Sequence, residues 1–382
     1  MDFAFSDEQK LLRDNIVGFA RRELNEGVVA RDRDEAFPRD LWQKCASLGI
    51  MGLPVPESYG GSGLDALSCA IALEALGYGT RDSGLVFSIS AHLLACVVPI
   101  MVHGDEMLKR KYLPGLVDGS LIGMHAITEP GSGSDSFAMR STARLDGAEW
   151  ILNGTKTFVS NGPVGDVCVA FALTDPVKAY HGGVTAFVID RGTPGFSSGQ
   201  KFEKMGLRTS AVSELVLDDV RVSSEAVLGE VGGGAAVFAT AMEWERVLLV
   251  AGHVGTMERL LDTCVAYART RSQFGQPIGK FQAVAHKLAD MKVRLEASKS
   301  LLYRTAWRLG RHRAISLDAS IVKLFVSESL VQVALDAVQV HGGNGYMTEF
   351  EVERALRDAV GGTIYSGTSE MQRNIIARWL GL

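Results

Sequence analysis

Apolar positions recur at helical spacing through the first third of the chain, give way to short β-rich runs, and then return to helical spacing. Near the N-terminus, Ser6 and Gln9 form a capping-box signature ahead of the first apolar helical run. Pro38 and Gly49 bracket the helix that comes next, because Pro favours the first turn and Gly the position after the last. These patterns predict an all-helical domain over residues 1–120.

The residue pattern in the middle of the chain is typical of a β-domain. Its apolar runs are short, rich in β-branched residues, and bounded by Gly, Pro and Asp. Asp-Gly at 146–147 and Asn-Gly at 153–154 are typical of tight hairpin turns. We therefore predict a small antiparallel β-domain, a barrel or a sandwich, over residues 121–230.

Helical periodicity returns after the glycine-rich stretch VGGGAAVF at 231–238, which we interpret as a hinge between domains. Long amphipathic runs then continue to the end of the chain. They predict a helical bundle over residues 231–382, so that the order along the chain is helical, β, helical.

One apolar segment, residues 83–102, is about as long as a membrane span requires. It contains His92, Pro99 and three serines, and neither an aromatic belt nor a basic flank accompanies it. We therefore predict a buried core helix and no membrane partner.

Composition narrows the class of protein further. The chain has 382 residues, 47% of them hydrophobic and 22% charged, which indicates a globular protein with sizeable cores. A net charge of −5 argues against a nucleic-acid partner. The five cysteines are widely spaced and odd in number, which is typical of reduced thiols in a cytoplasmic protein. Neither Cys nor His shows the spacing of metal ligands, and the N-terminus lacks a signal-peptide pattern.

The glycine-rich stretch TEPGSGSD at 128–135 is the first candidate for ligand contact. It lacks the G-K-[ST] ending of a Walker loop, and VGGGAAVF lacks the dinucleotide fingerprint. Its backbone N–H groups and the hydroxyls of Thr128 and Ser134 suit a pyrophosphate or a flavin edge. An ordinary polar turn is the open alternative.

Several stretches in order resemble the acyl-CoA dehydrogenase family over essentially the whole chain. They are HAITEPGSGSD, WILNGTKTFVSNG, YARTRSQFGQPIGKFQAVAHKLADM, QVHGGNGYMTEFEVERALRDA and IYSGTSEMQRNIIAR. The resemblance implies a helical domain, a middle β-domain and a C-terminal four-helix bundle. It also implies an FAD cofactor and a homo-oligomer, more often a tetramer than a dimer.

The resemblance also implies which residues hold the flavin. Thr128 and Ser134 would bind its ring edge and pyrophosphate, Phe158 would back the ring where many relatives have Trp, and Ser160 would add a hydroxyl. A second set would reach FAD from a neighbouring subunit: Arg271, Phe274, Gln339, Gly343, Thr368 and Glu370. Residues implied to contact substrate are Ser134, Arg246, Tyr365, Ser366 and Gly367.

The catalytic base is the point at which this sequence departs from the commonest members of the family. Many relatives carry a Glu in a Y-E-G-T stretch, whereas this chain has Ser366 there, and a serine cannot act as that base near neutral pH. Isovaleryl and some long-chain enzymes instead carry the Glu just before a family Arg, a pattern matched by Glu245 and Arg246. Glu243 is the rival, but it lies about 200° away around a helix. We predict Glu245 as the base that removes the α-proton of an acyl thioester.

The substrate class is more open. The combination of MEWERVLLVAGHVGTMER with TIYSGTSEMQRNIIAR resembles dehydrogenases that oxidise aminoacyl groups, notably prolyl, on carrier-protein phosphopantetheine in natural-product pathways. A short- or branched-chain acyl-CoA dehydrogenase of catabolism is the second reading. A flavin monooxygenase or a non-catalytic flavin-binding relative is the third. Electrons would leave to an electron-transfer flavoprotein or to O2.

Overall fold

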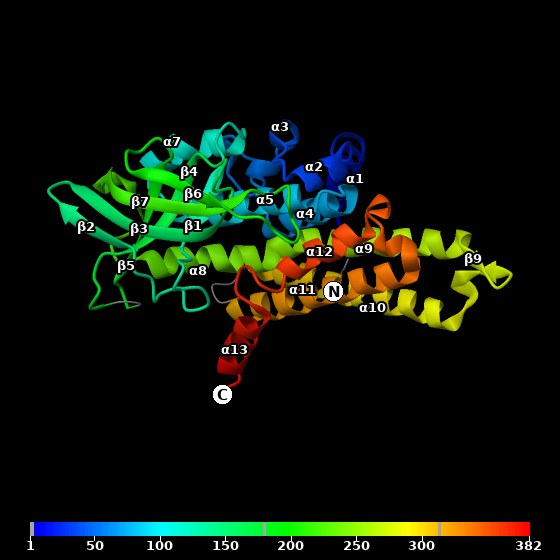
Figure 1. The fold of residues 1–382 in the computed structure, drawn as a ribbon. Helices are drawn as coiled ribbons and strands as arrows, with labels where there is room; N and C mark the ends of the chain where they lie inside the picture. Colours follow the sequence, from blue (N-terminus) through cyan, green and yellow to red (C-terminus); the bar gives the residue numbers. More distant parts are fainter. Residues whose placement is uncertain (1–3, 179–180, 312–314) are drawn as a thin grey trace.

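The N-terminal region of the computed structural model, which describes residues 4–178, 181–311 and 315–382, is a layer of helices (Figure 1). The predicted capping box is present at Ser6 and Gln9, Pro38 is the N-cap of the third helix, and Gly49 takes the left-handed conformation just beyond it. The elements are α1 (Asp7–Glu23), α2 (Val28–Asp34), α3 (Arg39–Ser47), η1 (Ile50–Gly52), η2 (Glu57–Tyr59), α4 (Ala66–Gly79), α5 (Ser83–His92), η3 (Leu93–Val97), α6 (Val98–His103) and α7 (Glu106–Val117).

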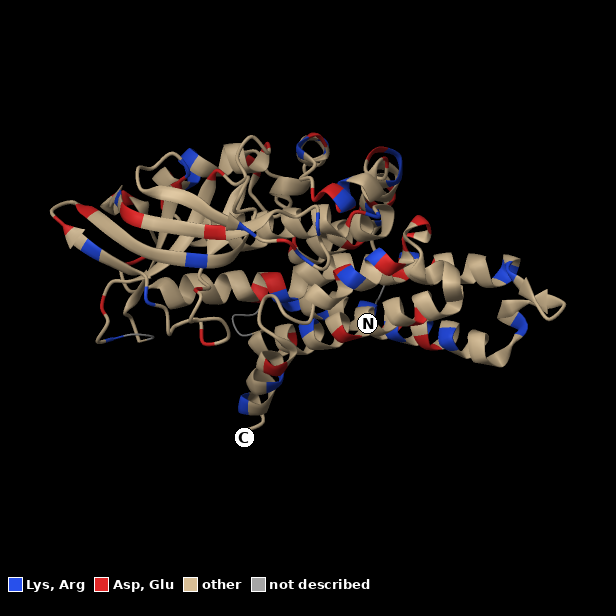
Figure 2. Ribbon diagram, in the orientation of Figure 1, with Lys and Arg blue, Asp and Glu red and all other residues tan. Residues whose placement is uncertain are grey.

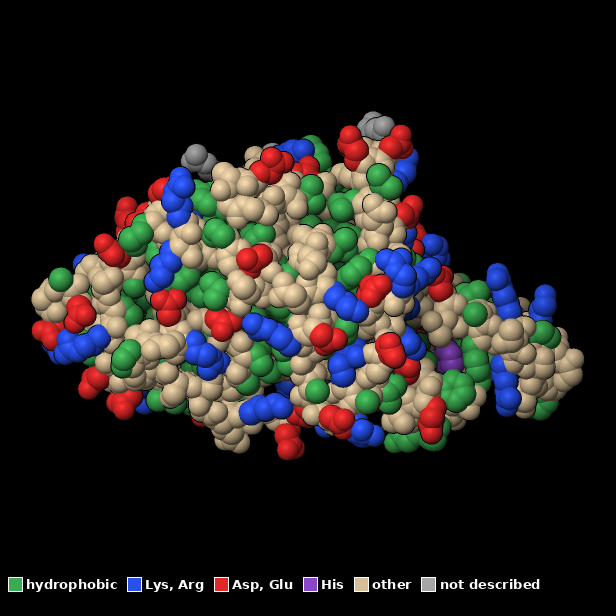
Figure 3. All heavy atoms as spheres, turned by 90° about the horizontal axis from the view of Figure 1, so that it is seen from above, with side chains coloured by type: hydrophobic (Ala, Val, Ile, Leu, Met, Phe, Trp, Pro, Cys, Tyr) green, Lys and Arg blue, Asp and Glu red, His purple; other side chains and the backbone are tan. Residues whose placement is uncertain are grey.

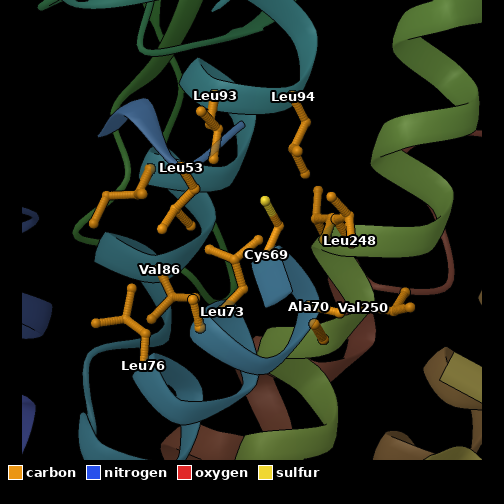
Figure 4. Close-up of a cluster of buried hydrophobic side chains, with 14 of the residues drawn as sticks. Leu53, Cys69, Ala70, Leu73, Leu76, Val86, Leu93, Leu94, Leu248 and Val250 are labelled. Atoms are coloured by element: carbon orange, nitrogen blue, oxygen red, sulfur yellow. The ribbon is translucent and has the colours of Figure 1, made fainter. Parts of the chain in front are cut away.

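The apolar segment at residues 83–102 is a buried core helix, as predicted. Elements α5, η3 and α6 run on without a break, and η3 is a π-helical turn within them. Ser83–His103 is long and apolar enough to cross a membrane, but 78% of its apolar window is buried inside the protein. Figure 4 shows Leu94 of η3 and Leu248 from the C-terminal region pointing into one apolar cluster with Cys69. The segment therefore joins the N-terminal helices to the C-terminal ones.

The middle of the chain forms one large sheet, as the β-rich runs predict. Its strands are β1 (Gly123–Ala126), β2 (Thr142–Asp146), β3 (Glu149–Ser160), β4 (Val167–Leu173), β5 (Val184–Asp190), β6 (Phe196–Lys201), β7 (Val212–Ser223) and β8 (Val227–Leu228), with η4 (Ser224–Ala226) before the last. Most neighbours pair antiparallel, whereas β1 and β2 each pair with β4 in parallel. A separate apolar cluster fills the interior of this domain.

Only one of the two predicted hairpin dipeptides makes a turn. Asp146 pairs with Glu149 across the tight turn between β2 and β3, as predicted. The prediction for Asn153-Gly154 was wrong, because these residues lie inside β3 at a shift of register. Gly154 is needed there for close approach, since a Cβ on it would lie 2.1 Å from Oγ of Ser141.

The C-terminal region is helical again. Its elements are α8 (Gly234–Trp244), η5 (Glu245–Leu249), α9 (Val250–Thr270), β9 (Ser272–Gln273), β10 (Gln276–Pro277), η6 (Ile278–Lys280), α10 (Gln282–Arg308), α11 (Ser316–His341), η7 (Gly342–Tyr346), η8 (Thr348–Phe350), α12 (Val352–Gly361) and α13 (Ser369–Trp379). Helices α9, α10 and α11 pack on one another, and α4 packs on α9. The hinge interpretation of 231–238 holds only in part, because α8 already begins at Gly234.

The predicted order of helical, β and helical regions is therefore confirmed. In Figure 1 the sheet and the β9–β10 hairpin lie at opposite ends of the molecule, and α13 projects away from its body. Acidic and basic residues alternate along the ribbon in Figure 2 and mix over the face shown in Figure 3. On that face no large area carries charge of one sign.

Candidate active site

The predicted base, Glu245, occupies an unusual backbone position. It is the first residue of η5, a π-helical turn that joins α8 to α9 without interrupting the helix. Such turns are rare and frequently mark functional sites. Glu245 is only 8% exposed, and η5 packs against η3, the other π-helical turn. The carboxyl group is therefore held in the seam between the N-terminal and C-terminal helices.

The structure brings Glu245 and Ser366 together. Oγ of Ser366 donates a hydrogen bond of 3.1 Å to Oε2 of Glu245. Burial raises the pKa of Glu245 to about 7, and the Ser366 hydrogen bond and the nearby Arg246 charge oppose that rise. A carboxyl group that titrates near neutral pH suits a general base.

Donors on three elements fix the loop that carries Ser366. Ser366 and Gly367 both have positive φ, 53° and 88°, a strained conformation for a serine. The Ser366 carbonyl accepts from Nε of Arg246 at 3.2 Å and from Nε2 of Gln372 at 3.3 Å. The Gly367 carbonyl accepts from Nζ of Lys323 at 2.6 Å and from Gln372 at 2.8 Å. Arg246 thus braces the loop, and its predicted contact with substrate stays a prediction.

Glu243, the rival base, has a different environment. It is half-buried, and burial raises its pKa while Arg246 acts against that rise. The side chain that meets Ser366 belongs to Glu245. The geometry therefore favours Glu245, in agreement with the sequence argument.

Tyr365, predicted to contact substrate, is clamped from two sides. Its hydroxyl lies 2.6 Å from Nε2 of His253, and its ring centroid lies 4.7 Å from that of Phe87. Sequence reasoning missed both partners: Phe87 lies in none of the stretches that carry the resemblance, and His253 lies in one of them but was given no role. Burial lowers the pKa of His253 to about 3, so its imidazole is neutral at physiological pH.

Two of the predicted flavin contacts lie side by side on the β-domain. The Thr128 carbonyl accepts from the Thr157 amide at 2.8 Å, next to Phe158. Phe158 has a φ of 55° at a β-bulge, is 65% exposed, and packs against Phe202 with ring centroids 5.1 Å apart. Ser160 continues the same strand. An exposed aromatic face beside a half-buried threonine is thus available to a planar ligand.

A buried ion pair, Lys156 with Glu129, anchors the loop that holds Ser134. Nζ of Lys156 lies 2.7 Å from Oε1 of Glu129 and is fully buried. Glu129 also accepts from the backbone amides of Arg140 and Ser141, at 2.6 and 2.9 Å. Both ends of the exposed loop that holds Ser134 are therefore tied to one carboxylate. Sequence reasoning missed this pair as well.

The remaining predicted flavin contacts fall into two places. Thr368 caps α13 by accepting from the Met371 amide at 3.3 Å, two residues after Ser366, and Glu370 lies in the first turn of α13. The other four, Arg271, Phe274, Gln339 and Gly343, are all exposed. Arg271 follows α9 and Phe274 follows β9, whereas Gln339 and Gly343 lie at the end of α11 and in η7, which contact Tyr267 of α9 through His341 and Asn344. Figure 1 shows β9 at the end of the bundle far from the sheet. One chain therefore does not bring these four next to Phe158.

The groups at the β-domain fit FAD. The aromatic face of Phe158 suits the flavin ring, and the hydroxyls and N–H groups of the 128–135 loop suit the ring edge and the phosphates. Gly131 and Gly133 face open space, so the loop leaves room for a ligand. Among the described residues, no group of three or more His, Cys, Asp or Glu could hold a metal ion.

A buried carboxyl group whose pKa is raised towards neutral, and an exposed aromatic ring next to a glycine-rich loop, are features that suit a flavin-dependent dehydrogenase. The sequence matches the family descriptions "Acyl-CoA dehydrogenase, N-terminal domain" over residues 6–120, "middle domain" over 125–220 and "C-terminal domain" over 232–381. The chain therefore belongs to the acyl-CoA dehydrogenase family, which confirms the predicted fold class. It is an FAD-dependent oxidoreductase that acts on CH–CH bonds.

Individual relatives are similar over their full length. An L-prolyl-[peptidyl-carrier protein] dehydrogenase of Serratia sp. (strain ATCC 39006) is 41% identical over 382 residues, which are 100% of this chain and 99% of the relative. The crystal structure of the prolyl acyl carrier protein oxidase AnaB is 46% identical with a TM-score of 0.97, covering 99% of this chain and 100% of that one. The structure of PigA with FAD and proline is 40% identical with a TM-score of 0.97 and covers 100% of both chains.

Proposed function

We propose that this protein dehydrogenates the α,β-bond of an acyl thioester carried on the phosphopantetheine arm of a carrier protein, with prolyl as the acyl group, in natural-product biosynthesis. The observation that carries the proposal is the buried Glu245, whose carboxylate accepts a hydrogen bond from Ser366. The substrate class is supported by the similarity to the prolyl-carrier dehydrogenase, AnaB and PigA.

Glu245 is the group that moves the proton. Its carboxylate takes the proton from the α-carbon, and the β-hydrogen departs with its electron pair, so that the C–C single bond becomes a double bond. Bound FAD supplies the acceptor for that hydride. Because Glu245 is buried, its carboxylate is poorly solvated and correspondingly basic.

The other residues of the site hold the base and the cofactor in place. Ser366 fixes the carboxylate of Glu245 through its hydroxyl. Arg246 and Lys323 fix the carbonyls of Ser366 and Gly367, which follow that hydroxyl in the chain. Thr128, Ser134, Phe158 and Ser160 would hold FAD at the β-domain.

A second copy of the chain is part of the proposal. Arg271, Phe274, Gln339 and Gly343 lie at the end of the bundle opposite the sheet, so they reach a flavin only on a neighbouring copy. Phe274 is 94% exposed although its ring meets that of Phe281 with centroids 6.1 Å apart, so most of its surface is open to a neighbouring copy. Light scattering of the purified protein should give the mass of a tetramer, and Phe274→Ala should lower FAD content. A monomer that retains FAD would contradict this part.

Two further parts of the proposal concern the cellular location of the enzyme and its electron acceptor. A cytoplasmic location is supported by the five cysteines, all of them buried and unpaired. The electron acceptor is either an electron-transfer flavoprotein or O2. Reoxidation of the substrate-reduced enzyme in air, compared with reoxidation by an electron-transfer flavoprotein under argon, decides between the two.

A CoA thioester is the second candidate substrate, because CoA and a carrier protein present the same pantetheine arm. The basic stretch KRKY at 109–112 gives little support to an acidic carrier, since Arg110 pairs with Glu106 and Lys111 with Asp190. The test is steady-state turnover of a prolyl-loaded carrier protein set against butyryl-CoA and isovaleryl-CoA. Higher kcat/KM for the carrier substrate supports the proposal, and turnover of the CoA esters alone would replace it with acyl-CoA catabolism.

A further inference from the structure

Phe158 combines two unfavourable states on the β-domain. Its side chain is 65% exposed, and its φ of 55° lies in a region that bulky side chains rarely adopt. Backbone outliers of this kind are energetically costly and cluster at functional sites. A ring in this state needs a neighbour that fixes its position.

Irregularities in two strands bring such a neighbour, Phe202, to Phe158. Strand β7 lies between β3 and β6, and Ser213 of β7 pairs with Val159 on one side and with Lys201 on the other. In both strands the register shifts just before the residue that pairs with Ser213. Phe158 directly precedes the first of these partners, and Phe202 directly follows the second. Bulges commonly redirect a side chain next to a functional site, and here two of them direct two rings to one place.

The rings of Phe158 and Phe202 are in contact. Their centroids lie 5.1 Å apart and their planes are inclined by 41°, within the range that aromatic pairs prefer. Phe202 is half-buried, and its amide donates to the Val212 carbonyl at 3.0 Å, which ties its backbone to β7. Contact with this better-anchored ring limits how far the exposed ring of Phe158 can turn. The rest of the Phe158 surface stays open to a planar ligand.

Packing of the protein interior does not account for this pair. Among the residues that the structure describes, neither ring belongs to the apolar cluster inside the β-domain or to the larger helical one. Phe187 and Phe196 of the same domain do belong to the β-domain cluster. The pair formed by Phe158 and Phe202 is therefore a surface feature, which suits contact with a ligand better than support of the core.

We propose that Phe202 is a positioning residue for the flavin: its ring fixes that of Phe158, and the two phenylalanines form one platform for the isoalloxazine ring of FAD. The inference rests on the part of the proposed function that places FAD at Phe158. Phe202 acts through Phe158. It gives the exposed ring one orientation in place of several, so that less conformational freedom is lost when the cofactor binds.

The test uses the FAD-loaded protein and measures two properties of the bound flavin. These are the rate of FAD release after dilution and the visible circular dichroism, which reports how asymmetrically the flavin ring is held. Phe202→Ala should speed FAD release by about three- to tenfold, the fold-change that corresponds to the usual energy of an aromatic pair, and should weaken the visible dichroism. Phe158→Ala should have at least the same effect. Because Phe202 acts through Phe158, the double variant should release FAD no faster than Phe158→Ala alone.

Two further variants separate ring positioning from loss of packing. Phe202→Tyr keeps the ring and should retain the wild-type release rate and dichroism. Phe5→Ala is the matched control, because Phe5 is also half-buried and its ring meets that of Tyr303 with centroids 5.0 Å apart, but in the helical part of the molecule. It should leave both properties of the flavin unchanged. Thermal unfolding verifies that each variant is folded.

The outcomes separate the inference from the proposed function. If Phe202→Ala keeps the wild-type release rate and dichroism, or if the effects of the two substitutions multiply in the double variant, the positioning role of Phe202 is overturned. If Phe158→Ala leaves FAD unaffected, the placement of FAD at Phe158 and the inference both fail, while the assignment of Glu245 stands. A protein that shows the expected flavin effects, but whose flavin no thioester reduces, would overturn the proposed function and support the inference.

Discussion

Ser366 and Glu245 are 121 positions apart in the sequence, yet the hydroxyl of one donates a 3.1 Å hydrogen bond to the carboxylate of the other. The family resemblance implies a carboxylate at position 366 in many relatives, and this chain supplies one from position 245. The side chains at positions 245 and 366 therefore meet at the same place in the site. We therefore expect a carboxylate at either position to serve the same substrate atom.

That relationship predicts that the base can be moved. Glu245→Gly should lower kcat by about 10²–10⁴-fold, the usual contribution of general-base catalysis. The double variant Glu245→Gly/Ser366→Glu should recover at least about tenfold of this loss. Recovery should stay incomplete because position 366 has a φ of 53°, which a glutamate adopts at a cost. Single-turnover flavin reduction measures both variants, and a double variant no faster than the single one would contradict the shared position.

The pH dependence of catalysis should report the base. Burial raises the pKa of Glu245 to about 7, and only the ionised carboxylate accepts the proton. We therefore expect kcat/KM to fall about tenfold for each pH unit below about 6 and to level off above about 8. Glu243→Gln should keep this profile. A profile that is flat between pH 5 and 8 in the wild-type protein would argue against Glu245.

The raised pKa of Glu245 also predicts how the free energy of unfolding depends on pH. Between pH 4.5 and 7 the folded protein retains a proton on Glu245 that the unfolded chain releases, so this residue lowers stability as pH rises through that window. Above pH 7 the resulting decrease in the free energy of unfolding approaches about 3 kcal/mol. Glu245→Gln should therefore gain stability over wild type as pH rises from 5 to 8, by denaturant unfolding. A difference in stability between Glu245→Gln and wild type that stays constant from pH 5 to 8 would contradict the assignment.

The ion pair beneath the glycine-rich loop should be structurally costly to break. Lys156→Met leaves Glu129 buried without its cation, which typically destabilises a protein by about 3–5 kcal/mol. Because Glu129 ties down both ends of the loop with Ser134, FAD should also dissociate faster. Lys292→Met, which breaks an exposed pair with Glu296, should change stability by less than about 1 kcal/mol. Equal effects of the two variants in thermal unfolding would refute the role of Lys156.

Local signals were sufficient to predict the order of the regions. The capping box at Ser6, the helix bracketed by Pro38 and Gly49, and the hairpin at Asp146 all depend on neighbours within a few residues. Asn153-Gly154 failed for the same reason. Gly154 packs closely against Ser141, which directly precedes the neighbouring strand β2, and no local pattern reveals that contact.

The candidate site could be predicted in part. The family resemblance, with a Glu just before Arg246 and a serine at 366, predicts Glu245 as the base, and that role stays a prediction. His253 and Lys323 could not be found this way, because each acts on the 365–367 loop from a helix distant in sequence. The π-helical turn that presents Glu245 also escaped prediction, since η5 is set by packing against η3 and carries no signature of its own.

The central claim is that Glu245 removes the substrate proton, and anaerobic reduction of the bound flavin tests it most directly. Prolyl-loaded carrier protein is mixed with FAD-loaded wild type or Glu245→Gln, and the loss of flavin absorbance is followed in a stopped-flow instrument. We predict rapid loss for the wild type and a rate at least about 10²-fold lower for Glu245→Gln with the same FAD content. Reduction of both proteins at the same rate would contradict the assignment of the base.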